Sequence, residues 1–239
     1  MDHRWAVEAV VFDMDGVLVD SEDLWWEVRQ AFAAGLGLRW TAQDQTATMG
    51  LNTAGWARLL VERLQLRSRA GMDESDVARA IIAGMRDAYD RRMPLRDGAV
   101  EAVRVAAGHF SKVALASGSP RELGDFVLRR AGLDGLFAAT LYGDEVEHGK
   151  PAPDIYLRVL QTIGVAPALA VGIEDSGNGI RSLSAAGMAI VAAPGPGYPL
   201  SPEVLAMADA HIASMKDFDV EVVERAARGR AARPGPSRV

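Results

Sequence analysis

The sequence predicts an α/β protein in which a parallel-sheet core carries an inserted helical domain. Short apolar runs alternate with helical patterns through most of the 239 residues, and this alternation is typical of a parallel sheet covered by helices on both faces. The stretch 21–92 interrupts the alternation, because its apolar residues follow helical spacing and it has almost no strand candidates. We therefore expect one layered core and one helical insert.

Each predicted strand is a short apolar run that ends near glycine, serine, proline or an acidic residue, as buried strands do where they run into loops. The expected strands are 7–12, 113–116, 138–142, 169–173 and 188–193, and the expected core helices are 99–107, 121–131, 154–163 and 179–186. Pro94 and Gly98 mark the return to the core. The predicted domains are 1–20 with 94–225 for the core and 21–93 for the insert, and the basic segment 226–239 is predicted to be a flexible tail.

Composition narrows the class of function. The formal charge of -6 argues against general nucleic-acid binding, which depends on a basic surface, although a few focused cations and a metal can still hold a small anion. The chain has no cysteine, which excludes a disulfide, a thiol nucleophile and a thiolate metal site. Neither a signal-peptide pattern nor a long apolar run is present. We expect a cytoplasmic monomer or weak dimer with a small-molecule partner and no nucleic acid or membrane.

The segment DMDGVLVDSE places Asp13 and Asp15 directly after the first predicted strand. Open α/β sheets bind ligands at the carboxyl ends of their strands, so two acids at this point favour a functional role. A solvated turn with two acids explains the same residues. An EF-hand loop does not, because glycine falls at the fourth position rather than the sixth and no glutamate follows at the twelfth.

Three later segments place further polar side chains at strand ends. Ser117 and Gly118 of ALASGSP precede a predicted helix, where they suit either a phosphate or an ordinary helix N-cap. Lys150 of HGKPAPDIY is one of three lysines in the chain, and a Walker A loop is excluded because the glycine spacing is too long and proline follows the lysine. Glu174 and Asp175 of AVGIEDSGNGI suit a hard-cation site, and the alternative is that Asp175 and Ser176 form a helix-start pair that caps the next helix.

The joint occurrence of these segments is the stronger evidence. In order along the chain, four strand ends offer carboxylates, a hydroxyl, a lysine and more carboxylates. Together these groups form a metal and phosphate site. Four independent structural explanations would have to coincide to produce the same pattern.

The segments DMDGVLVDSE, ALASGSP, GKPAPDIY and GIEDSGNGI resemble the four ordered motifs of the haloacid dehalogenase-like superfamily, over nearly the whole chain. The resemblance implies a Rossmann-like core with a helical cap inserted just after the first motif, which agrees with the insert at 21–93. DSE followed by Leu24 and Trp25, and MGLNT in the cap, are similar to the sugar-phosphatase and β-phosphoglucomutase branch.

This resemblance implies a magnesium-dependent phosphatase that hydrolyses a small phosphate monoester, such as a sugar phosphate, through an aspartyl-phosphate. Asp13 is then the nucleophile and Asp15 the general acid and base. The implied Mg²⁺ ligands are Asp13, the Asp15 backbone carbonyl, Glu174 and Asp175, and the implied phosphate contacts are Ser117, Gly118 N–H and Lys150.

Other chemistries of the superfamily fit less well. A dehalogenase needs neither a metal nor the second acid, and a phosphonatase needs a cap lysine, which 21–92 lacks. A β-phosphoglucomutase-like mutase is the main alternative, but Trp25 stands where its histidine is expected, Thr53 where its arginine is expected, and its cap lysine is absent. A catalytically silent phosphate-binding regulator on the same fold is a further alternative.

Polar and aromatic residues of the cap are the candidates for substrate specificity, which the fold alone does not decide. They are Glu22, Trp25, Trp26, Asn52 and Trp56. An aromatic lining suits a sugar ring. For Trp56 and one of the two adjacent tryptophans, we expect a place in the helix core.

Overall fold

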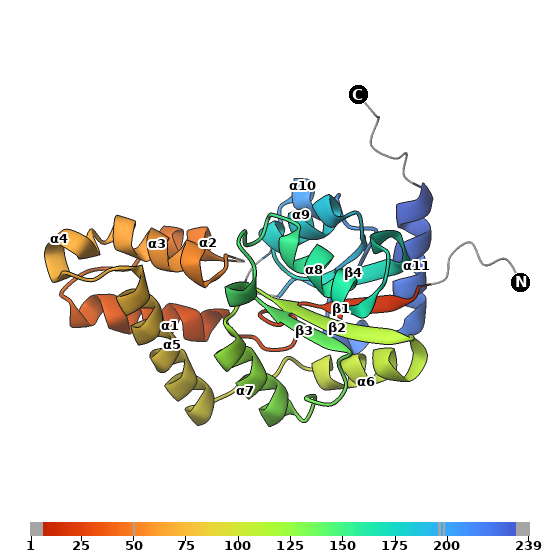
Figure 1. The fold of residues 1–239 in the computed structure, drawn as a ribbon, viewed down its shortest axis with the longest axis horizontal. Helices are drawn as coiled ribbons and strands as arrows, with labels where there is room; N and C mark the ends of the chain where they lie inside the picture. The colour runs from red at the N-terminus through yellow and green to blue at the C-terminus, as the bar shows by residue number, and fades with distance from the viewer. Residues whose placement is uncertain (1–6, 50, 196, 198, 233–239) are drawn as a thin grey trace, which may run out of the picture.

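The computed structural model describes residues 7–49, 51–195, 197 and 199–232 of the chain. Within this part, six parallel strands form one sheet in the order β3-β2-β1-β4-β5-β6. Helices cover both faces of the sheet, and a separate group of helices, α1 to α5, projects from one end of it (Figure 1). The predicted α/β class, with a Rossmann-like core and an inserted helical cap, is confirmed.

The strands lie close to the predicted runs, with one addition. They are β1 (Ala9–Phe12), β2 (Lys112–Ser117), β3 (Ala139–Tyr142), β4 (Ala170–Glu174), β5 (Ala189–Ala192) and β6 (Ala210–His211). β6 was not predicted, because two residues are too few to show a strand pattern. It is defined by its parallel pairing with β5, in which Ala210 is in register with Val191.

The core helices bury both faces of the sheet. They are α6 (Ala99–His109), α7 (Arg121–Ala131), α8 (Asp154–Ile163), α9 (Gly177–Ala186), α10 (Pro202–Leu205) and α11 (Val220–Ala232). Ala9 and Val11 of β1 belong to an apolar cluster with α8 and α9, whereas Val10 and Phe12 belong to a second cluster with α6, α7 and α11. Successive side chains of β1 therefore point to opposite faces, and all four are fully buried, as expected for a central parallel strand.

The described residues of the cap form helices joined by loops, with no strand, as predicted. These are α1 (Glu22–Gly35), α2 (Ala42–Thr48), α3 (Thr53–Arg63), α4 (Leu66–Ala70) and α5 (Glu74–Arg91). Thr41, Asn52 and Asp73 begin α2, α3 and α5, and the side chain of each accepts a hydrogen bond from a first-turn backbone N–H. α1 and α3 both pack against α5. Across the described chain, no helix combines the length and the apolar character needed to cross a membrane.

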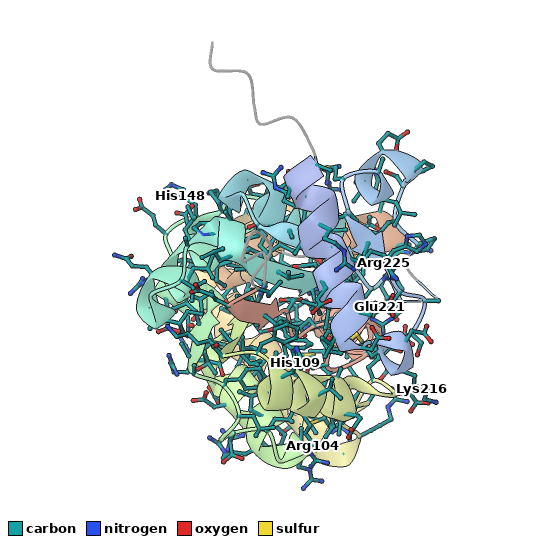
Figure 2. All side chains as sticks on the ribbon, turned by 90° about the vertical axis from the view of Figure 1, so that its right-hand side faces the viewer. Arg104, His109, His148, Lys216, Glu221 and Arg225 are labelled. Atoms are coloured by element: carbon teal, nitrogen blue, oxygen red, sulfur yellow. The ribbon has the colours of Figure 1, made fainter. Side chains whose placement is uncertain are left out.

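The C-terminal helix corrects one prediction. α11 extends to Ala232, so the prediction that 226–239 is a flexible tail is wrong for residues 226–232, while 233–239 lie outside the described residues. Val222, Val223 and Ala226 are buried and pack against β4, β5 and β6. This apolar face stabilises the helix despite its basic composition, and the charged side chains, such as Glu221 and Arg225, lie on its outer side (Figure 2).

Phe218 connects the segment before α11 to the centre of the sheet, and this contact provides a test of the core. Its ring centroid lies 5.5 Å from that of Phe12 in β1, and Phe218 is 6% exposed. We expect Phe218→Ala to lower the free energy of unfolding by about 3–5 kcal/mol, because it leaves a cavity in the core. Leu157→Ala on α8, where Leu157 is 42% exposed, should change it by less than about 0.5 kcal/mol. Urea denaturation measures both values, and equal effects would contradict this packing.

Candidate active site

The predicted functional segments meet at one edge of the sheet. β1 lies between β2 and β4, and Phe12 is in register with a residue of each neighbour. Because the three strands are parallel, Asp13, Ser117 and Glu174 reach the same edge. Lys150, from the loop before α8, completes the group through its side chain. The structure therefore brings the four segments together.

Lys150 is buried and bridges two acids. Its Nζ lies 2.7 Å from Asp13 Oδ1 and 2.6 Å from Glu174 Oε1, and it also donates to the Ala116 carbonyl at 3.4 Å. Burial by itself would lower the pKa of Lys150, but the Asp13 and Glu174 carboxylates outweigh burial and raise this pKa well above its ordinary value. The ammonium group therefore stays charged inside the protein.

Glu174 is fully buried at the end of β4, and both of its carboxylate oxygens accept hydrogen bonds. Oε1 accepts from Tyr156 OH at 2.9 Å, and Oε2 accepts from the backbone N–H groups of Asp175 and Ser176, both at 2.9 Å. Gly179 leaves room for this carboxylate, because a Cβ there would lie 1.6 Å from Oε1. Ser176 is the N-cap of α9, and its Oγ accepts from Gly179 N at 3.0 Å, so the helix-capping role predicted for the Asp175–Ser176 pair is confirmed for Ser176, whereas neither Glu174 nor Asp175 is the N-cap.

Asp13, Glu174 and Asp175 form a buried acidic cluster that fits a divalent cation. One carboxylate oxygen of each lies within 4.8 Å of the other two. Burial raises the pKa of Asp13 from 3.8 to about 8. Burial, followed by the charges of Glu174 and Asp13, raises the pKa of Asp175 well above its ordinary value. Lys150 supplies one positive charge to a cluster of three acids, and a hard cation with oxygen ligands would balance the rest.

Asp15 lies beside this cluster, and its carboxylate joins the cap to the core. Oδ1 accepts from Ser21 Oγ at 2.7 Å and from Trp25 Nε1 at 3.2 Å, both at the start of the cap. Oδ2 accepts from Ser119 Oγ at 2.7 Å and from Ser117 Oγ at 3.3 Å, at and just after the end of β2. Hydroxyl and indole donors therefore hold the Asp15 side chain outside the acidic cluster. Of the groups of Asp15, only the backbone carbonyl is left as a possible metal ligand.

Ser117 and Gly118 lie at the carboxyl end of β2, next to the acidic cluster. Ser117 is fully buried, its Oγ accepts from Ser119 N at 3.0 Å, and Gly118 lines the adjacent pocket. The N-cap of α7 is Pro120, and the first backbone N–H of the helix, that of Arg121, donates to the Asp144 carboxylate rather than to Ser117. The N-cap explanation of Ser117 is therefore excluded.

A pocket lies between the sheet edge and the cap. Its lining combines residues of the core and of the cap: Asp13, Asp15, Glu22, Trp25, Arg29, Thr48, Met49, Leu51, Trp56, Gly118, Ser119, Lys150, Asp175 and Ser176. The rings of Trp25 and Trp56 are 5.9 Å apart and inclined at 56°. Both tryptophans are buried in the cap core and also line the pocket, so the core and pocket roles are compatible.

Two predicted cap residues lie elsewhere. Asn52 is outside the pocket lining, because its Oδ1 accepts from Gly55 N at 2.9 Å to cap α3 and its Nδ2 donates to the Gly143 carbonyl of the core at 3.4 Å. Trp26 lines a different groove on the outside of the cap, next to Trp40. Asn52 thus connects the cap to the core, and its predicted role in substrate specificity has no support from its position.

Several residues of the site were not predicted from the sequence. Ser21, Ser119 and Tyr156 bind the catalytic-site carboxylates but lie in segments where hydroxyl groups are common. Arg29 was detectable, because it lies one helical turn after Trp25 and two after Glu22, on the same face of α1.

Comparison with known proteins agrees with this geometry. The sequence pattern of the haloacid dehalogenase-like hydrolases matches residues 7–187. The chain belongs to this family. Relatives of this hydrolase include a phosphorylated carbohydrates phosphatase of Thermotoga maritima, 31% identical over 182 residues, which cover 76% of this chain and 82% of the relative. Hexitol phosphatase B of Escherichia coli is 30% identical over 211 residues, 88% of this chain and 93% of the relative.

Solved structures show the same fold. CbbY from Rhodobacter sphaeroides, in complex with phosphate, matches this hydrolase with a TM-score of 0.77 and 25% identity, covering 91% of this chain and 99% of that one. A putative β-phosphoglucomutase from Thermotoga maritima matches with a TM-score of 0.67 and 28% identity, covering 88% and 96%. The family and fold expected from the four motifs are confirmed.

Gly16 provides a test of the close packing in the hydrolase site. Its φ is 79°, and a Cβ there would lie 1.8 Å from Asp175 Oδ2. We expect Gly16→Ala to displace Asp175 and to abolish the rise in melting temperature that MgCl₂ gives the wild type. Gly132→Ala is the matched control, because Gly132 has φ 65° and no atom within 4 Å of its Cβ, so it adds similar backbone strain without the clash. If MgCl₂ raised the melting temperature of Gly16→Ala as much as that of the wild type, Asp175 would not need this space.

The raised pKa of Asp13 predicts a pH-dependent stability. The folded protein retains a proton at Asp13 between 3.8 and about 8, where the unfolded chain has lost it, so without metal the free energy of unfolding should fall as pH rises through this range. Because protons compete with the metal, MgCl₂ should raise the melting temperature more at pH 8 than at pH 5.5. Thermal unfolding at both pH values, with Asp13→Asn as the control, checks this. An equal magnesium effect at the two pH values would count against a metal at Asp13.

Proposed function

We propose that this hydrolase is a magnesium-dependent phosphatase that acts on a small sugar or polyol phosphate through an aspartyl-phosphate. The observation that carries the proposal is the placement of Asp13 in the pocket, within a buried acidic cluster and in contact with Lys150. A site with this charge holds a divalent cation and a phosphate group together. Among the described acids, Asp13 combines three features: it contacts Lys150, it belongs to the acidic cluster and it lines the pocket.

The relatives support the reaction and the substrate class. They include the phosphorylated carbohydrates phosphatase and hexitol phosphatase B described above, and a fructose-1-phosphate phosphatase of Escherichia coli that is 32% identical over 189 residues. These names share a phosphate ester of a sugar or polyol. The identity of this chain's own substrate is part of the proposal.

The chain's residues divide the work of phosphoryl transfer. Asp13 attacks phosphorus and forms the aspartyl-phosphate, while Asp15 gives a proton to the leaving oxygen and then removes one from the attacking water. Ser117 Oγ, the Gly118 N–H and the Lys150 ammonium stabilise the transferring oxygens. The hydroxyl and indole donors around Asp15 hold its carboxylate in place for both proton transfers.

A divalent cation completes the site in this proposal. The residues that would hold Mg²⁺ are Asp13, Glu174, Asp175 and the Asp15 backbone carbonyl. When bound, Mg²⁺ neutralises charge on the phosphoryl group and on the carboxylates. Glu174 also contacts Lys150, Tyr156 and the start of α9, so it positions the site whatever its share of the metal.

The mutase alternative is weaker. Trp25, which stands where the mutase histidine is expected, donates to Asp15 Oδ1, and indole cannot accept or relay a proton at this position. The pocket cation of the cap is Arg29 rather than a lysine. Both features favour transfer of the phosphoryl group to water.

Substitution of the proposed nucleophile tests the function. Wild-type protein with MgCl₂ should hydrolyse para-nitrophenyl phosphate, EDTA should abolish this activity, and Asp13→Asn should lower kcat by at least about 10³-fold, because an amide is not a nucleophile. Asp23→Asn, which neutralises an exposed acid at the start of α1, should keep the wild-type rate. Release of p-nitrophenol measured at 405 nm provides the readout. Full activity in Asp13→Asn would rule out Asp13 as the nucleophile.

A further inference from the structure

Arg29 is a buried cation of the pocket that the proposed phosphoryl transfer does not use. It lies on α1, is 4% exposed, and its Cζ lies 4.7 Å from the ring centroid of Trp25 and 5.6 Å from that of Trp56. Nη1 donates to Gln45 Oε1 at 3.1 Å and to Thr48 Oγ1 at 2.8 Å. The guanidinium is thus held firmly between two aromatic rings at the cap side of the pocket.

One donor of Arg29 is left unpaired within the part of the chain that the structure describes. Its Nε is fully buried and makes no hydrogen bond among the described residues. Buried donors in native proteins are nearly always paired, and leaving one unpaired costs about 1–3 kcal/mol. Burial lowers the pKa of Arg29 to about 10, so the side chain is still charged at neutral pH. Arg29 also belongs to the pocket lining, so the side chain places a positive charge beside a ligand bound there.

Glu22 places an opposite charge in the same part of the pocket. Gln45 Nε2 donates to Glu22 Oε2 at 3.1 Å, while Gln45 Oε1 accepts from Arg29 and from Trp40 Nε1, also at 3.1 Å. These contacts determine which end of the Gln45 amide faces each charge. Burial lowers the pKa of Arg29, and the charges of Glu22 and then Asp15 act in the opposite direction. The positive charge of Arg29 is therefore already balanced on the cap side.

This balance decides which ligand chemistry fits. A hydroxyl group both donates and accepts, so neighbouring hydroxyls can accept from Arg29 and donate to Glu22. A second phosphate or a carboxylate only accepts, and it would be repelled by Glu22 and Asp15. An amine only donates when charged, and Arg29 would repel it. The apolar faces of Trp25 and Trp56 suit the C–H surface of a carbohydrate.

We propose that Arg29 and Glu22, held in place by Gln45, form the specificity site for the part of the substrate that is not transferred, and that this site selects a neutral polyhydroxylated leaving group over one with a second anionic group. The inference rests on the proposed phosphatase function and narrows it: the substrates are monophosphates of sugars or polyols, and bisphosphates and phosphorylated acids are rejected.

Paired substrates test this selectivity. The wild type with MgCl₂ is assayed at pH 8, above the pKa of about 7 to which burial raises Glu22, with fructose 1-phosphate against fructose 1,6-bisphosphate and glucose 1-phosphate against glucose 1,6-bisphosphate. For at least one pair, kcat/KM for the monophosphate should exceed that for the bisphosphate by at least about tenfold. Preference for the bisphosphates would overturn the proposal, and so would hydrolysis of para-nitrophenyl phosphate with no activity on either pair.

Variants assign the selectivity to residues. Glu22→Gln keeps the shape but removes the charge, and it should narrow the monophosphate preference by about tenfold. Arg29→Gln and Arg29→Lys should both lower kcat/KM for the preferred monophosphate by a factor at least about ten times larger than the factor by which they lower kcat/KM for para-nitrophenyl phosphate. Glu27→Gln is the matched control, because Glu27 lies on α1 with a 60% exposed side chain paired to Arg92, and its selectivity should equal that of the wild type.

The outcomes separate this inference from the phosphatase proposal. If the wild type fails to hydrolyse para-nitrophenyl phosphate, the phosphatase proposal itself fails. If it hydrolyses this substrate but Glu22→Gln, Arg29→Gln and Arg29→Lys lower all substrates by the same factor, these residues act only on structure and the specificity inference fails. Melting temperatures of the variants identify loss of folding, and Glu22→Gln, whose residue is only partly buried, remains informative if the Arg29 variants do not fold.

Discussion

The structure of this hydrolase depends on the burial of negative charge at the carboxyl edge of a parallel sheet. Asp13, Glu174 and Asp175 are all buried there, and a carboxylate loses much of its hydration in such a position. Lys150 compensates for part of this cost through its contacts with Asp13 and Glu174. The remaining cost raises the pKa of Asp13 and Asp175, which leaves a site prepared for a cation. The folded protein therefore holds more negative than positive charge at this site, and we expect a bound cation to balance it.

Much of the surrounding structure serves to keep these groups close together. Gly16 and Gly179 have no side chains where a Cβ would enter the carboxylates of Asp175 and Glu174. Arg96, just after the chain returns from the cap, donates to the carbonyls of Gly16, Ala193 and Pro194. This connects the loop after β1 to the segment after β5. Asp15 extends the same arrangement into the cap, because its acceptors hold Ser21 and Trp25. Cap position and the proposed proton transfer are therefore coupled through one carboxylate.

The strongest sequence signals were those carried by local chemistry. Apolar runs that stop at Asp13, Ser117 and Glu174 predicted both the strands and the residues that meet at their ends, because parallel strands place their carboxyl ends together. α11 and β6 escaped prediction for different reasons: a basic composition concealed the buried face of α11, and β6 exists only through its pairing with β5. In the cap, helical spacing predicted helices but not their packing. Asn52 therefore lies at the contact with the core rather than in the pocket, and Arg29 was overlooked although it shares a face with Trp25.

Anomalous diffraction from crystals grown with Mn²⁺ in place of Mg²⁺ would test the buried-charge interpretation most directly, because it locates the cation without reference to activity. We expect one strong peak within coordination distance of the Asp13 and Asp175 carboxylates, with Lys150 still in contact with Glu174. A peak distant from both aspartates, or no peak at a saturating Mn²⁺ concentration, would contradict the claim that this acidic cluster exists to hold a divalent cation.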